Sequence, residues 1–277
     1  MYSSKNTDNF SKSIARIDIR EITVKNFRAN FLLKNKPVLI TNIFSFNKKL
    51  SLWSPKYLAE KLGNKVVRIN TSKNGRFGID PIKGGAPMPP IFMPFNEYID
   101  KMNFSHQKLY LGQISIIREL PKLLEDIKIP IFINNKNPKI NLWVGPGGNT
   151  SPLHYDGMNN FFIQLYGTKK IWLSSPKEFY NLYPNPWYSR APHTSKVNIE
   201  NIDLNIFPKA SKVRFIEFTI KPGEMLFIPV YWWHQVLGEK VTVSVNMWWK
   251  AIIAQHLVPA ALHNLLYNIS MLFKKNQ

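Results

Sequence analysis

The sequence predicts a mainly β protein with flanking helices (α+β) whose core is a double-stranded β-helix, also called a jelly roll. From residue 140 onward, short apolar runs alternate with turn residues, which is the pattern of successive strands. Too little helical sequence separates these runs for parallel crossovers, so an antiparallel roll is favoured over βαβ units. The runs are INLWVGP, NFFIQLYG, KKIWLSS, VRFIEFTI, EMLFIP and VTVSVNMWW.

The N-terminal third is mixed α/β. The segments KPVLIT (36–41) and KVVRIN (65–70) have the β-branched content of strands. Between them, a Ser-Pro pair at 54–55 and Gly63 predict the start and the end of a short helix. Residues 71–95 are rich in Gly and Pro, so we expect a long irregular loop there.

No internal repeat or low-complexity linker divides the chain, so we expect one domain over residues 1–277. It would comprise an N-terminal α/β flank (about 1–135), the jelly-roll core (140–250) and a C-terminal helix (251–277). The helix follows from four-residue steps of Leu257, Ala261, Leu265 and Ile269. An apolar face of this kind would suit a homodimer if it is exposed, whereas packing on its own domain is the simpler alternative.

Composition limits the chemistry. The chain has 277 residues, 44% of them hydrophobic, which suffices for a real core. Because there is no cysteine, any metal must be held by imidazole, carboxylate or water, and disulfides, thiolate zinc sites and cysteine nucleophiles are excluded. The N-terminus is polar and no apolar run is long enough to cross a bilayer, so we expect a soluble cytoplasmic protein.

The formal net charge of +20 has two interpretations. Clustered Lys and Arg would indicate a polyanionic partner such as nucleic acid, because phosphate binding releases counterions. The basic residues are scattered, however, and the chain is also rich in Asn and Ile, as an AT-rich genome would encode. A solvated basic surface is therefore favoured over a nucleic-acid site.

The pattern His154-Tyr155-Asp156 predicts part of a metal site. Alternate residues of an extended chain point the same way, so His154 and Asp156 can chelate one ion. His234, which follows the run EMLFIPVYWW, can supply a third ligand if the roll brings the two strands together. Two His and one carboxylate leave coordination positions open, as in non-haem Fe(II) oxygenases that admit a co-substrate and O₂.

Further polar residues stand inside or beside apolar segments, where they need partners. Lys169, at the end of a strand, could bind the distal carboxylate of a keto diacid, although a turn lysine is the ordinary alternative. The neutral members of this group are Tyr110, Ser151, Asn160 and Asn246.

Together these segments resemble a known family. The run SPLHYDGMNNFFIQLYGTKKIWLSSP, followed by LYPNPW, KPGEMLFIPVYWWHQV and VTVSVNMWWK, resembles the JmjC/cupin-type Fe(II)- and 2-oxoglutarate-dependent oxygenases. Within the family it is most similar to the asparaginyl hydroxylase that inhibits hypoxia-inducible factor. The resemblance implies that His154, Asp156 and His234 bind iron and catalyse the reaction. It also implies that 2-oxoglutarate is held by Lys169, Tyr110 and Ser151, with Asn160 and Asn246 lining its pocket.

The resemblance implies a hydroxylase that acts with O₂ on a protein or peptide side chain. It departs from the asparaginyl hydroxylase after the LYP segment, where His193 and Thr194 replace an Arg-Gln pair that grips the target, so asparagine as substrate is in doubt. Three alternatives stay open: a JmjC-type tRNA-base hydroxylase, an N-methyl demethylase, and a catalytically silent binding module.

Other motifs are weaker. GPGGN (145–149) leads into a strand rather than a helix, so we interpret it as a turn and not as a phosphate loop. His256 and His263 could share a helix face, but two imidazoles do not complete a metal site. The tryptophans, among them Trp248, are interpreted as core residues.

Overall fold

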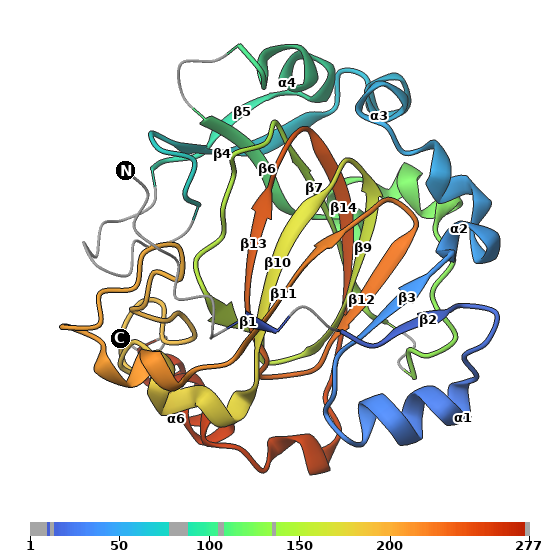
Figure 1. Cartoon of the computed structure of the whole chain (residues 1–277). Helices are drawn as coiled ribbons and strands as arrows, with labels where there is room; N and C mark the ends of the chain where they lie inside the picture. Colours follow the sequence, from blue (N-terminus) through green and yellow to red (C-terminus); the bar gives the residue numbers. More distant parts are fainter. Residues whose placement is uncertain (1–9, 12–13, 78–87, 105–107, 135–136, 275–277) are drawn as a thin grey trace.

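The fold is a roll of two facing β-sheets, seen in a computed structural model that describes residues 10–11, 14–77, 88–104, 108–134 and 137–274. Strands of both sheets occupy the centre of the molecule, and the helices lie around them (Figure 1). One sheet has the order β1 (Phe10–Ser11), β11 (Phe215–Ile220), β10 (Lys169–Ser174), β13 (Trp233–Gly238), β8 (His154–Tyr155). The other has the order β2 (Arg16–Asp18), β3 (Val38–Thr41), β12 (Glu224–Ile228), β9 (Asn159–Tyr166), β14 (Thr242–Trp249), β7 (Lys139–Gly145), β6 (Lys108–Ser115), β4 (Val66–Ser72), β5 (Ile91–Pro94).

Neighbouring strands within the core pair antiparallel, as a jelly roll requires. The parallel pairs, β1 with β11 and β2 with β3, lie at the outer ends of the two sheets. The predicted mainly β fold with flanking helices is confirmed.

Alternation along the strands divides the core into three layers. Between the sheets, Phe162 and Leu226 of the longer sheet pack with Ile171 of the shorter one. The outer face of the longer sheet carries Phe161 and is covered by the N-terminal helices. Trp233 on the outer face of the shorter sheet packs in a third cluster with residues from the surrounding loops and 3₁₀ helices.

The helices are short except for the last. The α-helices are α1 (Val24–Phe27, continued by a π-helix over Arg28–Leu32), α2 (Ile43–Phe46), α3 (Pro55–Leu62), α4 (Phe95–Lys101), α5 (Ile116–Glu119) and α6 (Pro259–Lys274). The 3₁₀ helices span Lys48–Leu52, Pro121–Asp126, Pro176–Leu182, Pro208–Lys212 and Ile253–His256. Within the described part of the chain, no helix combines the length and the apolar character that a membrane span needs.

The N-terminal predictions are largely confirmed. The segments 36–41 and 65–70 form β3 and β4, and α3 occupies the interval between the predicted signals. Ser54 caps α3 by accepting a hydrogen bond from the Tyr57 amide at 3.2 Å. Gly63 ends the helix with φ +52°, a conformation that favours glycine.

Four expectations were wrong in detail. The segment 71–95 is only partly irregular, because β4 extends to Ser72 and β5 pairs with it; residues 78–87 lie outside the described part. Lys169 begins β10 rather than ending a strand, since the left-handed Gly167 turns the chain just before it.

His234 lies within β13, not after a long strand, because Pro229 cannot extend the ladder of β12 and Tyr231 turns the backbone with φ +66°.

The C-terminal helical segment is divided. Residues Ile253–His256 form a 3₁₀ helix and α6 begins at Pro259, a residue suited to a first helical turn. Leu257 lies between the two, so the four-residue steps do not form one continuous stripe.

Because strands from the N-terminal flank are hydrogen-bonded into the same sheet as β9, β12 and β14, we propose that the chain folds as one domain.

Candidate metal centre and co-substrate site

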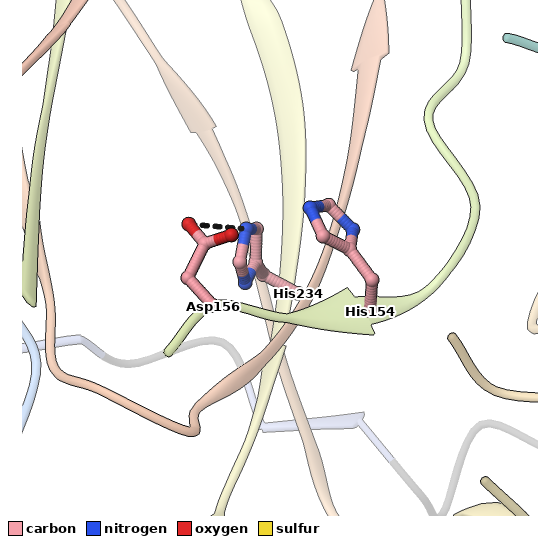
Figure 2. Close-up of side chains that lie close together, drawn as sticks. All are labelled: His154, Asp156 and His234. Carbon is pink, nitrogen blue, oxygen red and sulfur yellow. Dashed lines mark ion pairs between the residues drawn. The ribbon is translucent and has the colours of Figure 1, made fainter. Parts of the chain in front are cut away.

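Two neighbouring strands of the shorter sheet, β8 and β13, bring three potential metal ligands together. In the pairing of β8 with β13, His154 lies opposite His234. Asp156 is two residues farther along, so its side chain points to the same side as His154 (Figure 2). The ligand atoms of the three residues all lie within 4.8 Å of one another, and Asp156 Oδ2 is 3.8 Å from His234 Nε2. This spacing is compatible with one shared ion.

Both imidazoles are oriented by backbone carbonyls. His154 Nδ1 lies 2.8 Å from the Pro152 carbonyl oxygen, and His234 Nδ1 lies 3.0 Å from the Trp232 carbonyl oxygen. Since a carbonyl only accepts, each Nδ1 must carry the proton and donate. Each Nε2 is then left with its lone pair, as a metal ligand requires.

Asp156 is held by two side chains from β9 and β14. Its Oδ2 accepts a hydrogen bond from the Trp248 indole at 2.8 Å and a longer one from Asn160 Nδ2 at 3.5 Å. Burial opposes ionisation of Asp156, but the two neighbouring histidines and the Trp248 indole outweigh it and lower the carboxyl pKa. The carboxylate is therefore ionised and held in place, as a metal ligand requires.

Burial and the nearby His234 lower the pKa of His154 to about 4, so its ring is neutral at physiological pH. Two imidazoles and one carboxylate form the donor set that non-haem iron(II) accepts while keeping positions open. Within the described ranges, no further His, Asp or Glu joins this cluster. Zinc sites usually add a fourth ligand, so the set fits an open iron site better than a closed zinc site.

Lys169, the first residue of β10, is a buried cation in the same interior. Its side chain is 1% exposed, and within the described part of the chain no carboxylate lies within ion-pair distance of its Nζ. The ammonium instead lies 5.2 Å from the ring centroid of Phe162 and 6.0 Å from that of Tyr110. Burial lowers the pKa of Lys169 to about 7. A buried cation without a counterion is costly, which points to an anionic ligand.

Other polar atoms nearby also lack partners. Ser151 Oγ and Asn246 Oδ1 are buried without a hydrogen bond, although Asn246 Nδ2 donates to Asn160 Oδ1 at 2.8 Å. Buried polar atoms are nearly always satisfied in folded proteins, so each of these two atoms is a candidate contact for a polar ligand. The residues present thus fit a carboxylate-bearing co-substrate beside the metal ligands.

Aromatic rings connect the lysine to the metal ligands. The Tyr110 ring lies 5.9 Å from Trp143, and Trp143 lies 6.3 Å from Trp248, which donates to Asp156. Asn160 donates to Asp156, and Asn246 donates to Asn160. Lys169 lies on the same face of the shorter sheet as His234, four residues along β10 from Leu173, which pairs with His234. Tyr110 lies beside Lys169. Ser151 lies beside β13, where its amide donates to the Val236 carbonyl at 3.1 Å.

Trp248 was wrongly interpreted as core. Its neighbour Trp249 is 3% exposed and packs on Phe161, whereas Trp248 is half-buried on the opposite face of β14. Strand alternation relative to Asn246 could have placed it at the site. His193 lies near the triad, with its ring 6.4 Å from that of His154. Thr194 is buried and pairs with His154 through a backbone bridge.

The two other histidines do not share a helix face. His256 lies on the last 3₁₀ helix and His263 on α6, and each contacts a tyrosine hydroxyl rather than another imidazole.

Comparison with known proteins places this geometry in a family context. Lysine-specific demethylase 8 of Xenopus tropicalis is 32% identical over 82% of this chain and 51% of its own length. JmjC domain-containing protein D of Dictyostelium discoideum is 34% identical over 86% of this chain and 56% of its own. The human tRNA wybutosine-synthesizing protein 5 is 27% identical over 83% of this chain and 76% of its own. The chain spans about half the length of the first two.

Closeness to the asparaginyl hydroxylase stays a prediction. The family model described as a cupin-like domain matches residues 24–255, which include every strand of the two sheets except β1 and β2, and all three clustered ligands. The chain therefore belongs to the cupin-like domain family.

Proposed function

We propose that the protein is an Fe(II)- and 2-oxoglutarate-dependent dioxygenase that hydroxylates a protein or peptide side chain. The observation that carries this proposal is the buried Lys169, which no carboxylate of the described residues pairs with, in the same interior as a cluster of two His and one Asp. A metal site alone would not need the lysine, whereas a dicarboxylate co-substrate binds both.

In this proposal His154, Asp156 and His234 hold the iron. Lys169 binds the far carboxylate of 2-oxoglutarate, with Tyr110 and Ser151 beside it, while Asn160 and Asn246 line the same interior. Bound iron, with O₂ and 2-oxoglutarate, supplies the oxidation that places one oxygen atom in a C–H bond and releases succinate and CO₂. The chain's own part is to orient the ligands, neutralise the co-substrate and exclude water.

The substrate class has two serious candidates. Some relatives are named lysine-specific demethylases, and demethylation is the same hydroxylation at an N-methyl carbon, after which formaldehyde leaves. Another is named as a tRNA-modifying protein, and the net charge of +20 favours an RNA partner. We favour a polypeptide because the basic residues are dispersed along the chain. A silent binding module is disfavoured since all three ligands and Lys169 are present.

One experiment separates these substrates. The purified protein is incubated with Fe(II), 2-oxoglutarate and O₂ together with candidate peptides or tRNA, and products are analysed by mass spectrometry. The Asp156→Ala variant serves as the control without a complete ligand set. We expect a gain of one oxygen, or loss of a methyl group, on a polypeptide. A hydroxylated nucleoside with RNA-stimulated succinate formation would instead show that tRNA is the substrate.

Salt dependence gives a second criterion. If the protein contacts several RNA phosphates, the logarithm of its RNA association constant should fall linearly with the logarithm of the salt concentration. The slope should be roughly 0.7 to 0.9 for each phosphate contacted. Peptide binding in a groove depends on backbone hydrogen bonds and side-chain pockets, so it should respond far less. We expect RNA binding to be weak and strongly salt-sensitive.

A homodimer through α6 is part of the same proposal. Leu262, Leu265 and Ile269 of this helix are 61%, 54% and 41% exposed. Light scattering at several protein concentrations measures whether two copies associate.

A further inference from the structure

The segment that carries Asp156 has little support from the sheets. Strand β8 is only two residues long and lies at the edge of its sheet, paired with β13 on one side and, on the other, only with the loop around Thr194 through a backbone bridge. Asp156 lies just beyond the last residue of that strand. A short edge strand does not by itself fix a side chain to the precision that a metal ligand needs.

The side of this segment that faces away from the ligands is held by the C-terminal part of the chain. Tyr155, between the two ligands, points to the opposite face, where it is 1% exposed and its ring lies 4.9 Å from Trp233. Its hydroxyl lies 2.9 Å from His263 Nδ1 on α6. His263 Nε2 lies 3.0 Å from the carbonyl oxygen of Asn185, which can only accept. Nε2 therefore carries the proton, and the Tyr155 hydroxyl donates to Nδ1.

A second tyrosine and histidine repeat this arrangement. The amide of Tyr231 donates to the Asp156 carbonyl at 2.9 Å. Tyr231 has φ +66°, a conformation that costs a non-glycine residue energy and needs support from its surroundings. Its hydroxyl is hydrogen-bonded to His256 Nδ1 at 2.9 Å. The Asp156 backbone is thus held through Tyr231 by a second residue of the C-terminal segment.

The glycine after Asp156 shows how closely α6 approaches. A Cβ atom added to Gly157 would lie 3.2 Å from Asn264 Nδ2, so the helix packs directly against the segment. Residues 155–157 therefore contact α6 through both a hydrogen bond and close packing.

We propose that residues 256–264 are a positioning element of the metal centre, acting through the Tyr155–His263 and Tyr231–His256 hydrogen bonds. This inference rests on the proposed metal-binding function. Tyr155 and His263 touch neither metal nor substrate in this scheme and act by fixing Asp156. Loss of a hydrogen bond made directly to a metal ligand weakens metal binding by about 10- to 100-fold, and these two bonds act one step further out, so we expect the lower end of that range.

The test measures metal binding directly, without turnover. The full chain and the variants Tyr155→Phe and His263→Phe are titrated with Co(II), whose visible absorption reports ligand geometry. We expect each variant to bind Co(II) about tenfold more weakly with an altered spectrum. Because both residues share one hydrogen bond, the double variant should be little weaker than either single variant.

Tyr98→Phe is the matched control. Tyr98 is also fully buried, and its hydroxyl donates to the Val144 carbonyl at 2.6 Å and accepts from the Leu111 amide at 3.1 Å. It should lower thermal stability yet leave Co(II) affinity and spectrum unchanged. Wild-type affinity and spectrum in folded Tyr155→Phe and His263→Phe would overturn the inference. Failure of the wild-type chain to bind Co(II) would instead remove the metal assignment on which it rests.

Discussion

Two buried charges in this molecule have opposite surroundings. Asp126, at the end of a 3₁₀ helix in the N-terminal flank, is 4% exposed, and one of its oxygens accepts from Trp53, Tyr57 and Lys61. Lys169 in the roll is 1% exposed, its ammonium lies over the rings of Phe162 and Tyr110, and no carboxylate of the described residues pairs with it. Buried charges are normally paired, so the saturated Asp126 is typical of a structural network. A buried lysine without a carboxylate partner among the described residues, such as Lys169, is typical of a site that a ligand completes.

Effects on pKa reflect the same difference. Burial tends to raise the pKa of Asp126, but the donors on Lys61, Tyr57 and Trp53 outweigh it, and the net shift is downward. For Lys169, burial acts unopposed and lowers the pKa to about 7. The comparison predicts that variants of Asp126 affect folding, whereas variants in the roll affect binding and turnover.

The largest expected effect is on activity. Asp156→Ala should reduce 2-oxoglutarate turnover at least about 100-fold, because it removes a metal ligand together with the acceptor of the Trp248 indole hydrogen bond. The free energy of unfolding should change little, since Asp156 is only partly buried. Succinate release and denaturant unfolding measure the two quantities. Turnover at the wild-type rate would exclude this residue from the site.

Asp126→Ala should instead lower the stability of the fold. Removing the carboxylate takes away the acceptor that Trp53, Tyr57 and Lys61 share, which should cost about 3 kcal/mol of unfolding free energy. Because the folded-state pKa of Asp126 is lowered, its stabilisation is present above the ordinary carboxyl pKa and is lost as pH falls through the folded value.

Glu125→Ala is the control for that variant. The Glu125 side chain is 72% exposed and its contact with Lys61 is 3.6 Å, so its loss should change stability by less than about 0.5 kcal/mol. Urea unfolding compares the two variants. Equal effects would mean that the Asp126 network is not a structural centre.

Lys169→Met tests whether the lysine binds the co-substrate. Removing a charge-assisted hydrogen bond to a carboxylate should cost roughly 1.5–3 kcal/mol, which appears as a raised 2-oxoglutarate KM. Metal affinity should not change, and the free energy of unfolding without ligand should rise because an unpaired buried charge is gone. A KM like that of the wild type would assign the carboxylate to another cation.

Trp248→Phe is expected to have a smaller effect. It keeps the ring but removes the indole donor to Asp156, so metal affinity should fall by about tenfold. Trp172→Phe makes the same change to an indole that donates to Glu217 at 2.7 Å, away from the clustered ligands. Only Trp248→Phe should alter Co(II) binding. If both variants bind Co(II) with the same affinity, the Trp248 hydrogen bond does not contribute to metal binding.

Local signals in the sequence were sufficient for part of this picture. Ser54 and Gly63 bounded α3 because caps act within one turn of the chain, and strand alternation put His154 and Asp156 on one face. The pairing of His154 with His234 depends on sheet register between distant strands, which no local signal specifies. The hydrogen bond of Trp248 depends on that register too, so the residue was taken for core.

The smallest expected effect is a pH dependence of 2-oxoglutarate binding. With a pKa of about 7 in the ligand-free protein, Lys169 is half protonated at pH 7 and about one-tenth protonated at pH 8. If only the ammonium binds the carboxylate, affinity should fall roughly fivefold over that interval, with a proton taken up on binding. The folded protein holds fewer protons than the unfolded chain between pH 7 and the ordinary lysine pKa, so ligand-free stability should rise across this window. Calorimetric titrations of the Co(II)-loaded protein in buffers of different ionisation enthalpy measure the proton uptake. Lys169→Met should abolish it, whereas uptake that persists in this variant would come from another group.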